Sequence, residues 1–248
     1  MVRLDRIGKR YGRGPWVLHE VDLTVEPGEV VVATGGNGSG KSTLLRIAAG
    51  VTAPTAGRVE RPPSIGYLPE RFPSGVKMPA RDYLRHLAGV RGVPLRWDLV
   101  DALGFVGDEH APMATLSKGN TQKVAIAMAL HATDLLVLDE PWSGLDAAAG
   151  AVLGELLVAT EAAVLLTDHH GHDLPGSRVL GLGTTGSVGV VIELDRVGES
   201  LALLSALDGV FEAREVGAGA RVEVRSGHSD AVLAEALRLG CSVRSVRS

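Results

Sequence analysis

The pattern of apolar and polar positions predicts strands that alternate with helices over most of this 248-residue chain. Short alternating or apolar stretches are typical of strands, and these cover residues 2–7, 16–25, 29–33, 135–138 and 163–167. Helical spacing is found in longer segments, and these cover residues 41–50, 79–106, 121–131 and 146–159. Residues 51–68 are broken by prolines and glycines, which indicates turns and short strands. The alternation predicts an α/β fold with a mostly parallel sheet covered on both faces.

The composition of the sequence changes over residues 171–189, which are rich in glycine, serine and threonine. Beyond them the pattern predicts the order β, α, β, β, α, β, which is that of a small ferredoxin-like unit. About sixty residues is near the lower size limit for an independent core. We therefore expect a large domain over residues 1–178, with a helical part at about 79–130, and a small C-terminal α+β domain over residues 190–248.

Composition narrows the classes of function. Lys and Arg number 25 against 29 Asp and Glu, so the net charge of −4 gives no electrostatic reason to expect nucleic-acid binding. The single cysteine, Cys241, excludes an internal disulfide framework and favours a reducing compartment. No stretch reaches the roughly 20 apolar residues that cross a bilayer, and the N-terminus lacks the apolar segment of a signal peptide. These features predict a soluble, intracellular chain.

A glycine-rich segment carries the strongest chemical signal. Residues 35–42 fit the phosphate-binding pattern G-x-x-x-x-G-K-[ST], between a predicted strand and a predicted helix. Glycines let backbone N–H groups surround a phosphate, and the helix N-terminus adds partial positive charge. Lys41 can reach the β- and γ-phosphates, and the Ser42 hydroxyl can bind Mg²⁺. The predicted loop consists of Gly35, Gly36, Asn37, Gly38, Ser39, Gly40, Lys41, Ser42 and Thr43.

An acidic pair follows the apolar run 135–138. Asp139, at the end of this predicted buried strand, is placed to hold Mg²⁺. Glu140 is placed to act as general base toward an attacking water. An Asp-Glu pair alone is usually a solvated strand end, but a phosphate loop about a hundred residues upstream favours the functional interpretation.

The order of these segments, from about Tyr11 to His169, resembles the nucleotide-binding subunit of an ABC transporter. Leu116–Asn120 (LSKGN), followed by Gln122, resembles the LSGGQ signature, and residues 143–146 (SGLD) resemble the D-loop. His169 resembles the switch histidine. Tyr11, 30 residues before Lys41, resembles the aromatic residue that stacks on adenine.

The resemblance implies a P-loop ATPase with an N-terminal antiparallel β subdomain and a helical signature subdomain. It implies a homodimer, or a closely related heterodimer, closed head to tail around two Mg-ATP. Ser117 and Gly119 would then face the ATP on the partner's phosphate loop, and Asp146 would connect the two sites. Glu140, His169 and Lys41 would carry catalysis. Separate integral membrane subunits would hold this chain at the inner face of the cell membrane, with no nucleic-acid partner.

Two departures from the family pattern affect the interpretation. Lys118 and Asn120 replace a Gly and the Gln of the signature. Glu70 stands where the family usually has Gln, so it would add a negative charge near Mg²⁺, and we count it with Ser42 and Asp139 as a metal ligand. The segments LSKG and YLPE together resemble the branch that powers exporters of drugs, lipid-linked molecules or polysaccharides.

Several alternatives stay open. The chain could instead be a soluble ABC-type switch, or a regulatory subunit that binds ATP without hydrolysing it. Trp16 could replace Tyr11 at the adenine, although packing in the N-terminal sheet is favoured, and His170 could replace His169. The spacing of His169, His170 and His172 follows no standard zinc pattern. Trp142 is expected to pack beside the strand that carries the acidic pair.

Overall fold

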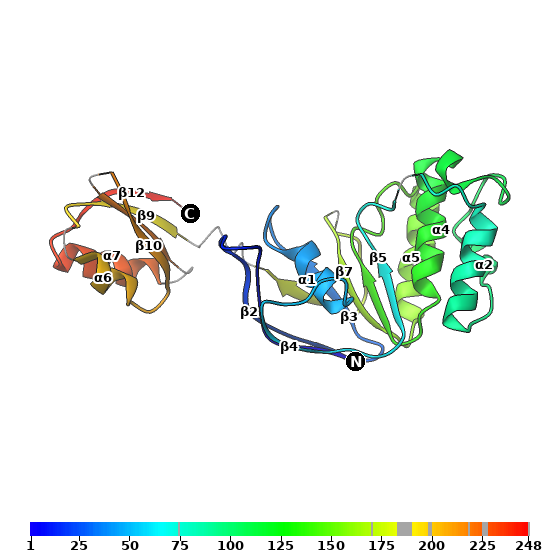
Figure 1. Cartoon of the computed structure of the whole chain (residues 1–248), viewed down its shortest axis with the longest axis horizontal. Coiled ribbons are helices and arrows are strands. Elements are labelled where there is room, and N and C mark those ends of the chain that lie inside the picture. The colour runs from blue at the N-terminus through cyan, green and yellow to red at the C-terminus, as the bar shows by residue number, and fades with distance from the viewer. Residues whose placement is uncertain are drawn as a thin grey trace.

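This computed structural model describes residues 1–73, 75–169, 171–182, 190–197, 200–217, 219–224 and 228–247. The described strands form three sheets, two in the large N-terminal unit and one in the C-terminal unit (Figure 1). None of the helices in these ranges is both long enough and apolar enough to cross a membrane.

The first sheet is antiparallel and has the order β2-β1-β4. Its strands are β1 (Val2–Arg10), β2 (Trp16–Val25) and β4 (Ala56–Glu60). Alternate residues are buried at the start of β1 and at the end of β2, among them Val2, Leu4 and Leu23. This period of two fixes which face of the sheet turns toward the core.

The central sheet is parallel and has the order β5-β6-β7-β3-β8. Its strands are β3 (Val30–Thr34), β5 (Ile65–Leu68), β6 (Leu135–Leu138), β7 (Ala163–Thr167) and β8 (Arg178–Gly181). β6 and β7 are buried at every position, which explains their continuous apolar sequences.

Each face of the central sheet has its own core. Leu135, Val137 and Leu165 pack on one face with α1 (Lys41–Ala48) and the N-terminal sheet. Leu136, Leu138 and Leu166 pack on the other face with α4 (Lys118–Leu130) and α5 (Ala147–Ala159). Figure 1 shows α1 on one side of the sheet and α4 and α5 on the other.

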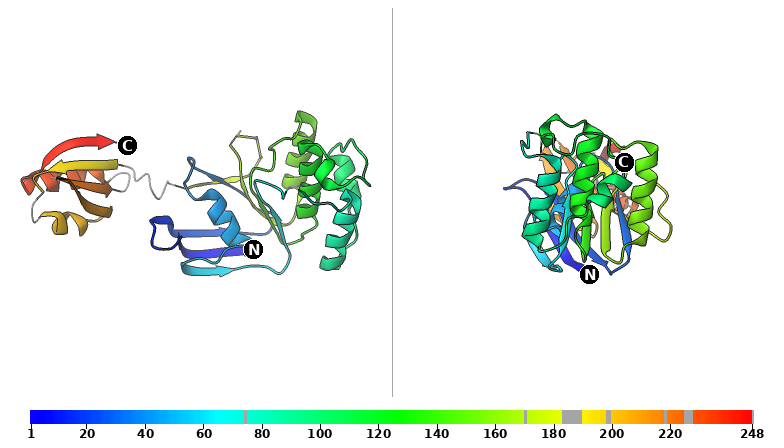
Figure 2. Two further views of the ribbon diagram at one scale, coloured as in Figure 1. Left: turned by 45° about the horizontal axis from the view of Figure 1, so that its top comes forward. Right: turned by 90° about the vertical axis from the view of Figure 1, so that its right-hand side faces the viewer.

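A third core holds the helical part together. It joins α2 (Ala80–Arg91), α3 (Trp97–Ala102) and the 3₁₀ turn Met113–Thr115 to one side of α4. Figure 2 shows these helices gathered at the end of the large unit that lies away from the N-terminal sheet. The predicted segment 79–106 is therefore two helices, because the chain turns through a left-handed Gly92 (φ 68°) at the end of α2.

The C-terminal unit has the predicted order of elements. These are β9 (Val190–Asp195), α6 (Ser200–Ser205), β10 (Val210–Val216), β11 (Gly219–Val224), α7 (Ser229–Arg238) and β12 (Ser242–Arg247). The sheet order β10-β11-β9-β12, antiparallel throughout, is that of a split βαβ unit. Ile192, Leu194 and Val222 centre a separate core that also contains Cys241.

Two features differ from the sequence expectations. β8 lies inside the glycine-rich stretch, so the central sheet runs to Gly181, three residues beyond the predicted limit of the large domain. Its four residues are partly or fully exposed and carry little apolar pattern. α4 begins at Lys118, three residues before the predicted start, because Ser117 caps it. Residues 183–189 lie outside the described part of the chain.

Candidate functional site

The glycine-rich loop connects the end of β3 to the start of α1, as its sequence predicted. Gly40 precedes α1 in the left-handed region (φ 92°). A Cβ at Gly40 would lie 2.6 Å from Cδ2 of Leu18 and 2.8 Å from the carbonyl oxygen of Val17. Only glycine meets both demands, so the close fit of the loop against β2 depends on this position.

Lys41 is the buried cation of the loop, with 9% of its surface exposed. Its Nζ donates to the carbonyl oxygens of Gly35 at 2.8 Å and Gly36 at 3.0 Å. These bonds hold the ammonium group over the curled loop. A negatively charged ligand seated in the loop would therefore meet a fixed positive charge as well as the N-terminus of α1.

Asp139 and Glu140 follow β6 and share one organising residue. Thr167, the last residue of β7, donates from Oγ1 to Oδ1 of Asp139 at 2.9 Å. Oγ1 of Thr167 also accepts the backbone N–H of Glu140 at 2.8 Å. Glu140 has a positive φ of 52°, which is uncommon for a residue other than glycine. The hydroxyl of Thr167 thus fixes both the first carboxylate and the backbone turn that carries the second.

His169 lies against Glu140. Its backbone N–H donates to Oε2 of Glu140 at 3.2 Å, and its ring Nε2 lies 3.4 Å from Oε1. The Glu140 side chain is 16% exposed and the His169 side chain is 48% exposed. The carboxylate is therefore sheltered while the imidazole reaches solvent, an arrangement suited to a base that is positioned by its neighbour.

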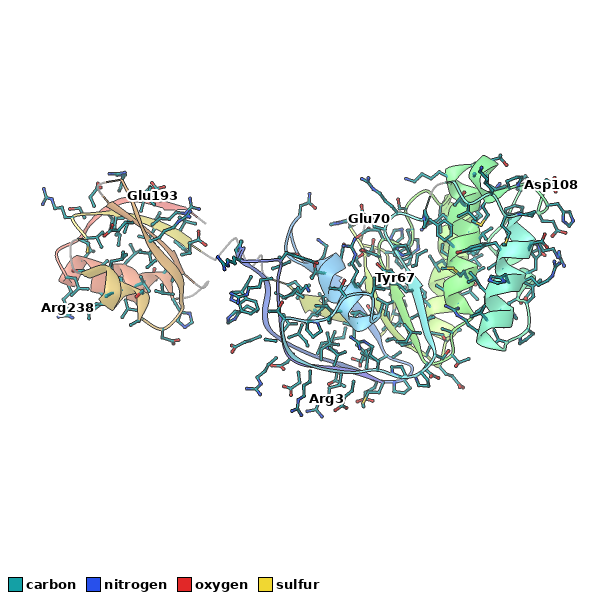
Figure 3. All side chains as sticks on the ribbon, viewed as in Figure 1. Arg3, Tyr67, Glu70, Asp108, Glu193 and Arg238 are labelled. Carbon is teal, nitrogen blue, oxygen red and sulfur yellow. The ribbon has the colours of Figure 1, made fainter. Side chains whose placement is uncertain are left out.

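A cavity of about 290 Å³ joins these elements. Besides the phosphate loop from Asn37 to Thr43, it is lined by Glu70, Asp139, Glu140, His169 and Val17. Figure 3 labels Glu70, which follows β5. The structure thus brings together most of the residues predicted for phosphate, metal and catalysis. Val17 was not predicted, because an apolar strand residue gives no chemical signal.

The donor set at this cavity fits Mg²⁺. Oδ2 of Asp139 is buried and has no hydrogen-bond partner, whereas the buried Oε1 of Glu140 lies 3.4 Å from Nε2 of His169. Unpartnered buried carboxylate oxygens are costly unless a cation or a water completes them. Ser42 and Glu70 add two further oxygen donors on the same lining. Hard oxygen ligands beside a phosphate loop are what Mg²⁺ prefers.

The signature residues do not line this cavity. Ser117 caps α4, and its Oγ accepts the backbone N–H of Asn120 at 3.2 Å. The Asn120 side chain in turn donates to the carbonyl oxygen of Val106 at 2.6 Å, so this replacement for Gln ties the helix to a neighbouring loop. A Cβ at Gly119 would lie 3.0 Å from the carbonyl oxygen of Gly144. The signature therefore packs closely on the D-loop-like segment of its own chain.

Asp146 also lies away from the cavity. It caps α5, where Oδ1 accepts the Ala149 N–H at 2.9 Å and Oδ2 accepts from Nζ of Lys123 at 3.1 Å. The Ala149 amide, followed by the Lys123 ammonium, lowers the pKa of the Asp146 carboxyl. Lys123, which is buried on α4, was not predicted. The sequence around Lys123 gives no sign that this buried ammonium group pairs with Asp146.

The aromatic residues near the N-terminus have different surroundings. Tyr11 is 52% exposed, and Nζ of Lys9 lies 5.0 Å from its ring centre. It is not among the residues that line the cavity, so its contact with adenine stays a prediction. Trp16 packs on the N-terminal sheet, since a Cβ at Gly8 would come within 2.9 Å of its ring. Trp142 is 6% exposed and lies in the core beside β6. His170 lies outside the described residues.

Comparison with known proteins gives one consistent result. The family model described as ABC transporter matches residues 18–143. A zinc import ATP-binding protein of Pseudomonas putida is 39% identical over 177 residues, which are 69% of this chain and 65% of that protein. The chain thus spans less than two thirds of the length of that relative. A protein of the same name from Yersinia enterocolitica is 35% identical and is covered to 71% of its length.

Solved structures show the same fold. An ABC transporter ATP-binding protein from Pyrococcus furiosus has a TM-score of 0.61 at 25% identity, covering 73% of this chain and 96% of that one. The structure of an ATP-binding subunit of an ABC transporter has a TM-score of 0.63 at 26% identity, covering 68% and 80%. The names of the two relatives above give no support to the exporter branch expected from the LSKG and YLPE segments, since both are named as import proteins.

Proposed function

Because this chain belongs to the ABC transporter family, we propose that it binds and hydrolyses Mg-ATP at the cavity formed by the phosphate loop, Asp139, Glu140 and His169. One observation carries the proposal. A sheltered carboxylate of Glu140 keeps one oxygen without a hydrogen-bond partner, at the rim of a phosphate loop and in contact with His169.

The residues divide the chemistry between them. Backbone N–H groups of the loop and Nζ of Lys41 would bind the phosphate chain. Ser42, Glu70 and Asp139 would hold Mg²⁺, which when bound neutralises charge that develops on the phosphate oxygens. Glu140 would accept a proton from the attacking water through Oε1. His169 would hold the carboxylate in that orientation.

Replacing Glu140 by Gln tests hydrolysis directly. The amide has the shape of the carboxylate but cannot accept the proton, so we expect turnover to fall by about a hundredfold or more while Mg-ATP still binds. Glu161→Gln is the matched control, because Glu161 is exposed on a loop before β7 and should leave turnover unchanged. Turnover that survives in Glu140→Gln would show that Glu140 is not the base, and a wild-type chain without turnover would favour a regulatory subunit that binds ATP without hydrolysing it.

Head-to-tail dimerisation would explain why the signature lies outside the cavity of its own chain. Ser117 at the N-terminus of α4 would then face the ATP of the partner, where the partial positive charge of the helix favours the γ-phosphate. Glu140→Gln protein should therefore form an ATP-dependent dimer in size-exclusion chromatography, and Ser117→Arg should prevent that dimer without preventing ATP binding.

We further propose that the dimer drives separate membrane subunits and lies at the inner face of the cell membrane through them. A second cavity, of about 920 Å³, is lined by Glu70, Phe72, Met113 and Leu116 and extends to Glu140. A partner bound there would contact both Glu70, which is proposed to hold Mg²⁺, and Leu116 of the signature. Pull-down of tagged Glu140→Gln protein with Mg-ATP from detergent-solubilised membranes should recover a multi-span protein.

The cargo would be set by those membrane subunits. The names of the relatives make import the first direction to test and zinc the first cargo, with export as the competing outcome. Uptake of labelled zinc by cells with and without this chain, together with the identity of the recovered partner, separates the two. Recovery of ribosomes or nucleic acid would instead favour a soluble ATPase switch.

A further inference from the structure

Two segments that carry the catalytic pair are joined by an aromatic stack outside the cavity. Trp142 follows Glu140 by two residues, and His172 follows His169 by three. Their rings lie 4.4 Å apart between centres and only 12° from parallel. The stack thus adds a contact between the chain after β6 and the chain after β7, beyond the pairing of the two strands and the Glu140–His169 contact.

The indole ring of Trp142 is fixed against α5. Nε1 of Trp142 donates to the carbonyl oxygen of Gly150 on α5 at 3.1 Å. A Cβ at Gly150 would lie 3.3 Å from Cδ1 of Trp142, so glycine allows the indole to lie flat on the helix. Trp142 is 6% exposed. The indole is therefore a fixed surface of the large unit and not a mobile partner.

Asp168 holds the imidazole. Its carboxylate oxygens lie 3.0 and 3.1 Å from Nδ1 of His172, and Oδ2 also accepts the backbone N–H of His172 at 2.6 Å. The Asp168 side chain is 3% exposed, against 35% for His172. Asp168 directly precedes His169, so the residue that anchors the stack also sets the backbone from which the switch-like histidine projects.

We propose that Trp142 and His172, linked through Asp168, are positioning residues that hold His169 on Glu140. The geometry supports this because the two stacked residues directly follow the two residues in contact: Trp142 lies two residues after Glu140, and His172 lies three residues after His169. Without the stack, the segment that carries Asp168 and His169 loses its link through Trp142 to Gly150 of α5. The N–H of His169 would then leave Oε2 of Glu140, and the 3.4 Å approach of Nε2 to Oε1 would be lost. This inference rests on the proposed ATP hydrolysis.

A first experiment measures steady-state ATP hydrolysis of the full chain. We expect His172→Ala to lower kcat by about tenfold, since small misplacements of catalytic groups have effects of this size or larger. KM for Mg-ATP should change less than twofold, because the phosphate loop is untouched. His172→Phe keeps the stack but not the bond to Asp168, and should recover part of kcat. His86→Ala, in an exposed histidine on α2, is the matched control and should leave kcat unchanged.

A second measurement reports the stack without activity. In a Trp16→Phe, Trp97→Phe background Trp142 is the sole tryptophan, and His172→Ala should change its emission intensity, whereas His86→Ala should not. Unchanged kcat in His172→Ala with changed emission overturns the positioning role. A parallel rise in KM and fall in the unfolding midpoint overturns it in favour of a general structural role. Wild-type protein that hydrolyses no ATP, with emission still sensitive to His172, defeats the proposed function and not the stack.

Discussion

The hydroxyl of Thr167 donates to Asp139 at 2.9 Å and accepts from the backbone of Glu140 at 2.8 Å. One side chain at the end of β7 therefore orients two consecutive residues at the end of β6. The neighbouring parallel strands β6 and β7 place these ends side by side at the same edge of the sheet. Thr167 is itself fully buried, so its rotamer is fixed by the core around it.

Replacing Thr167 by Val should damage the site with little change in volume. The variant keeps the β-branched shape but leaves Oδ1 of Asp139 and the N–H of Glu140 without their partner. Loss of a group that orients a metal ligand costs about 10–100-fold in metal affinity or activity, so we expect a fall in that range. Titration of ATPase activity with Mg²⁺ measures it. Thr167→Ser should restore most of the loss, and failure of Ser to do so would mean that packing and not hydrogen bonding is responsible.

The pair Lys123–Asp146 should make stability depend on acid pH. Because the Ala149 amide and Lys123 lower the pKa of Asp146, its stabilisation is fully present above the ordinary pKa of about 4. It is lost as pH falls through the lowered pKa of the folded state. Asp146→Asn keeps a helix-capping side chain but removes the charge. Its unfolding midpoint should therefore lie below that of the wild type at pH 7 and approach it as the pH falls through the lowered pKa of Asp146.

Asp101→Asn provides the control for that experiment. Asp101 is exposed at the end of α3. Its variant should show no pH-dependent gap of the same kind. If the difference in unfolding midpoint between Asp146→Asn and the wild type stays constant from pH 7 to pH 2, the ionic contribution is contradicted. The stabilisation by Asp146 would then come from its helix cap alone.

Glu70 should help to hold Mg²⁺. It lines the same cavity as Asp139 and Ser42 and brings a negative charge where the family pattern has an amide. We expect Glu70→Gln to raise the Mg²⁺ concentration for half-maximal turnover by several-fold, because one anionic donor is lost. Turnover at saturating Mg²⁺ should not rise. A sharp rise would show instead that the Glu70 charge repels the γ-phosphate. Glu60→Gln, in exposed β4, is the control.

The sequence predicted the parts of the fold whose pattern is strong. β6 and β7 are buried on both faces, so their apolar runs and the acids that follow could be recognised directly. The phosphate loop was equally clear, since its glycines and Lys41 are required by one local geometry. β8 was missed because it is a short, mostly exposed edge strand, held by pairing with β3 and by the contact of Arg178 with Glu29, neither of which leaves an apolar pattern in the sequence.

The supporting residues of the site could not be predicted in the same way. Thr167 ends an apolar run and has no partner nearby in the sequence, and its role exists only because β7 lies beside β6. The roles of Asp168 and His172 depend on the stack of His172 on Trp142, which lies 30 residues before His172 in the chain. Ser117 caps α4 outside the cavity of its own chain, and the proposed head-to-tail dimer would give that position its role.

The two units of this chain should unfold in separate steps. The C-terminal unit has its own sheet and its own core around Ile192, Leu194 and Val222. At about sixty residues it buries only about 60% of the surface of its unfolded chain, so it should unfold at the lower temperature. The proposed Mg-ATP site lies in the large unit, so the nucleotide should stabilise that unit by about 2.7 kcal/mol at a hundredfold excess over Kd.

Calorimetry of the full chain should therefore show two transitions, of which only the upper one shifts with Mg-ATP. Ile192→Ala removes buried apolar atoms from the small core and should lower only the first transition. Leu136→Ala does the same for the core beside α4 and should lower only the second. A single transition that moves as a whole with Mg-ATP would mean that the two units are coupled. In that case the C-terminal unit would be expected to influence turnover, and removal of residues 190–248 would change it.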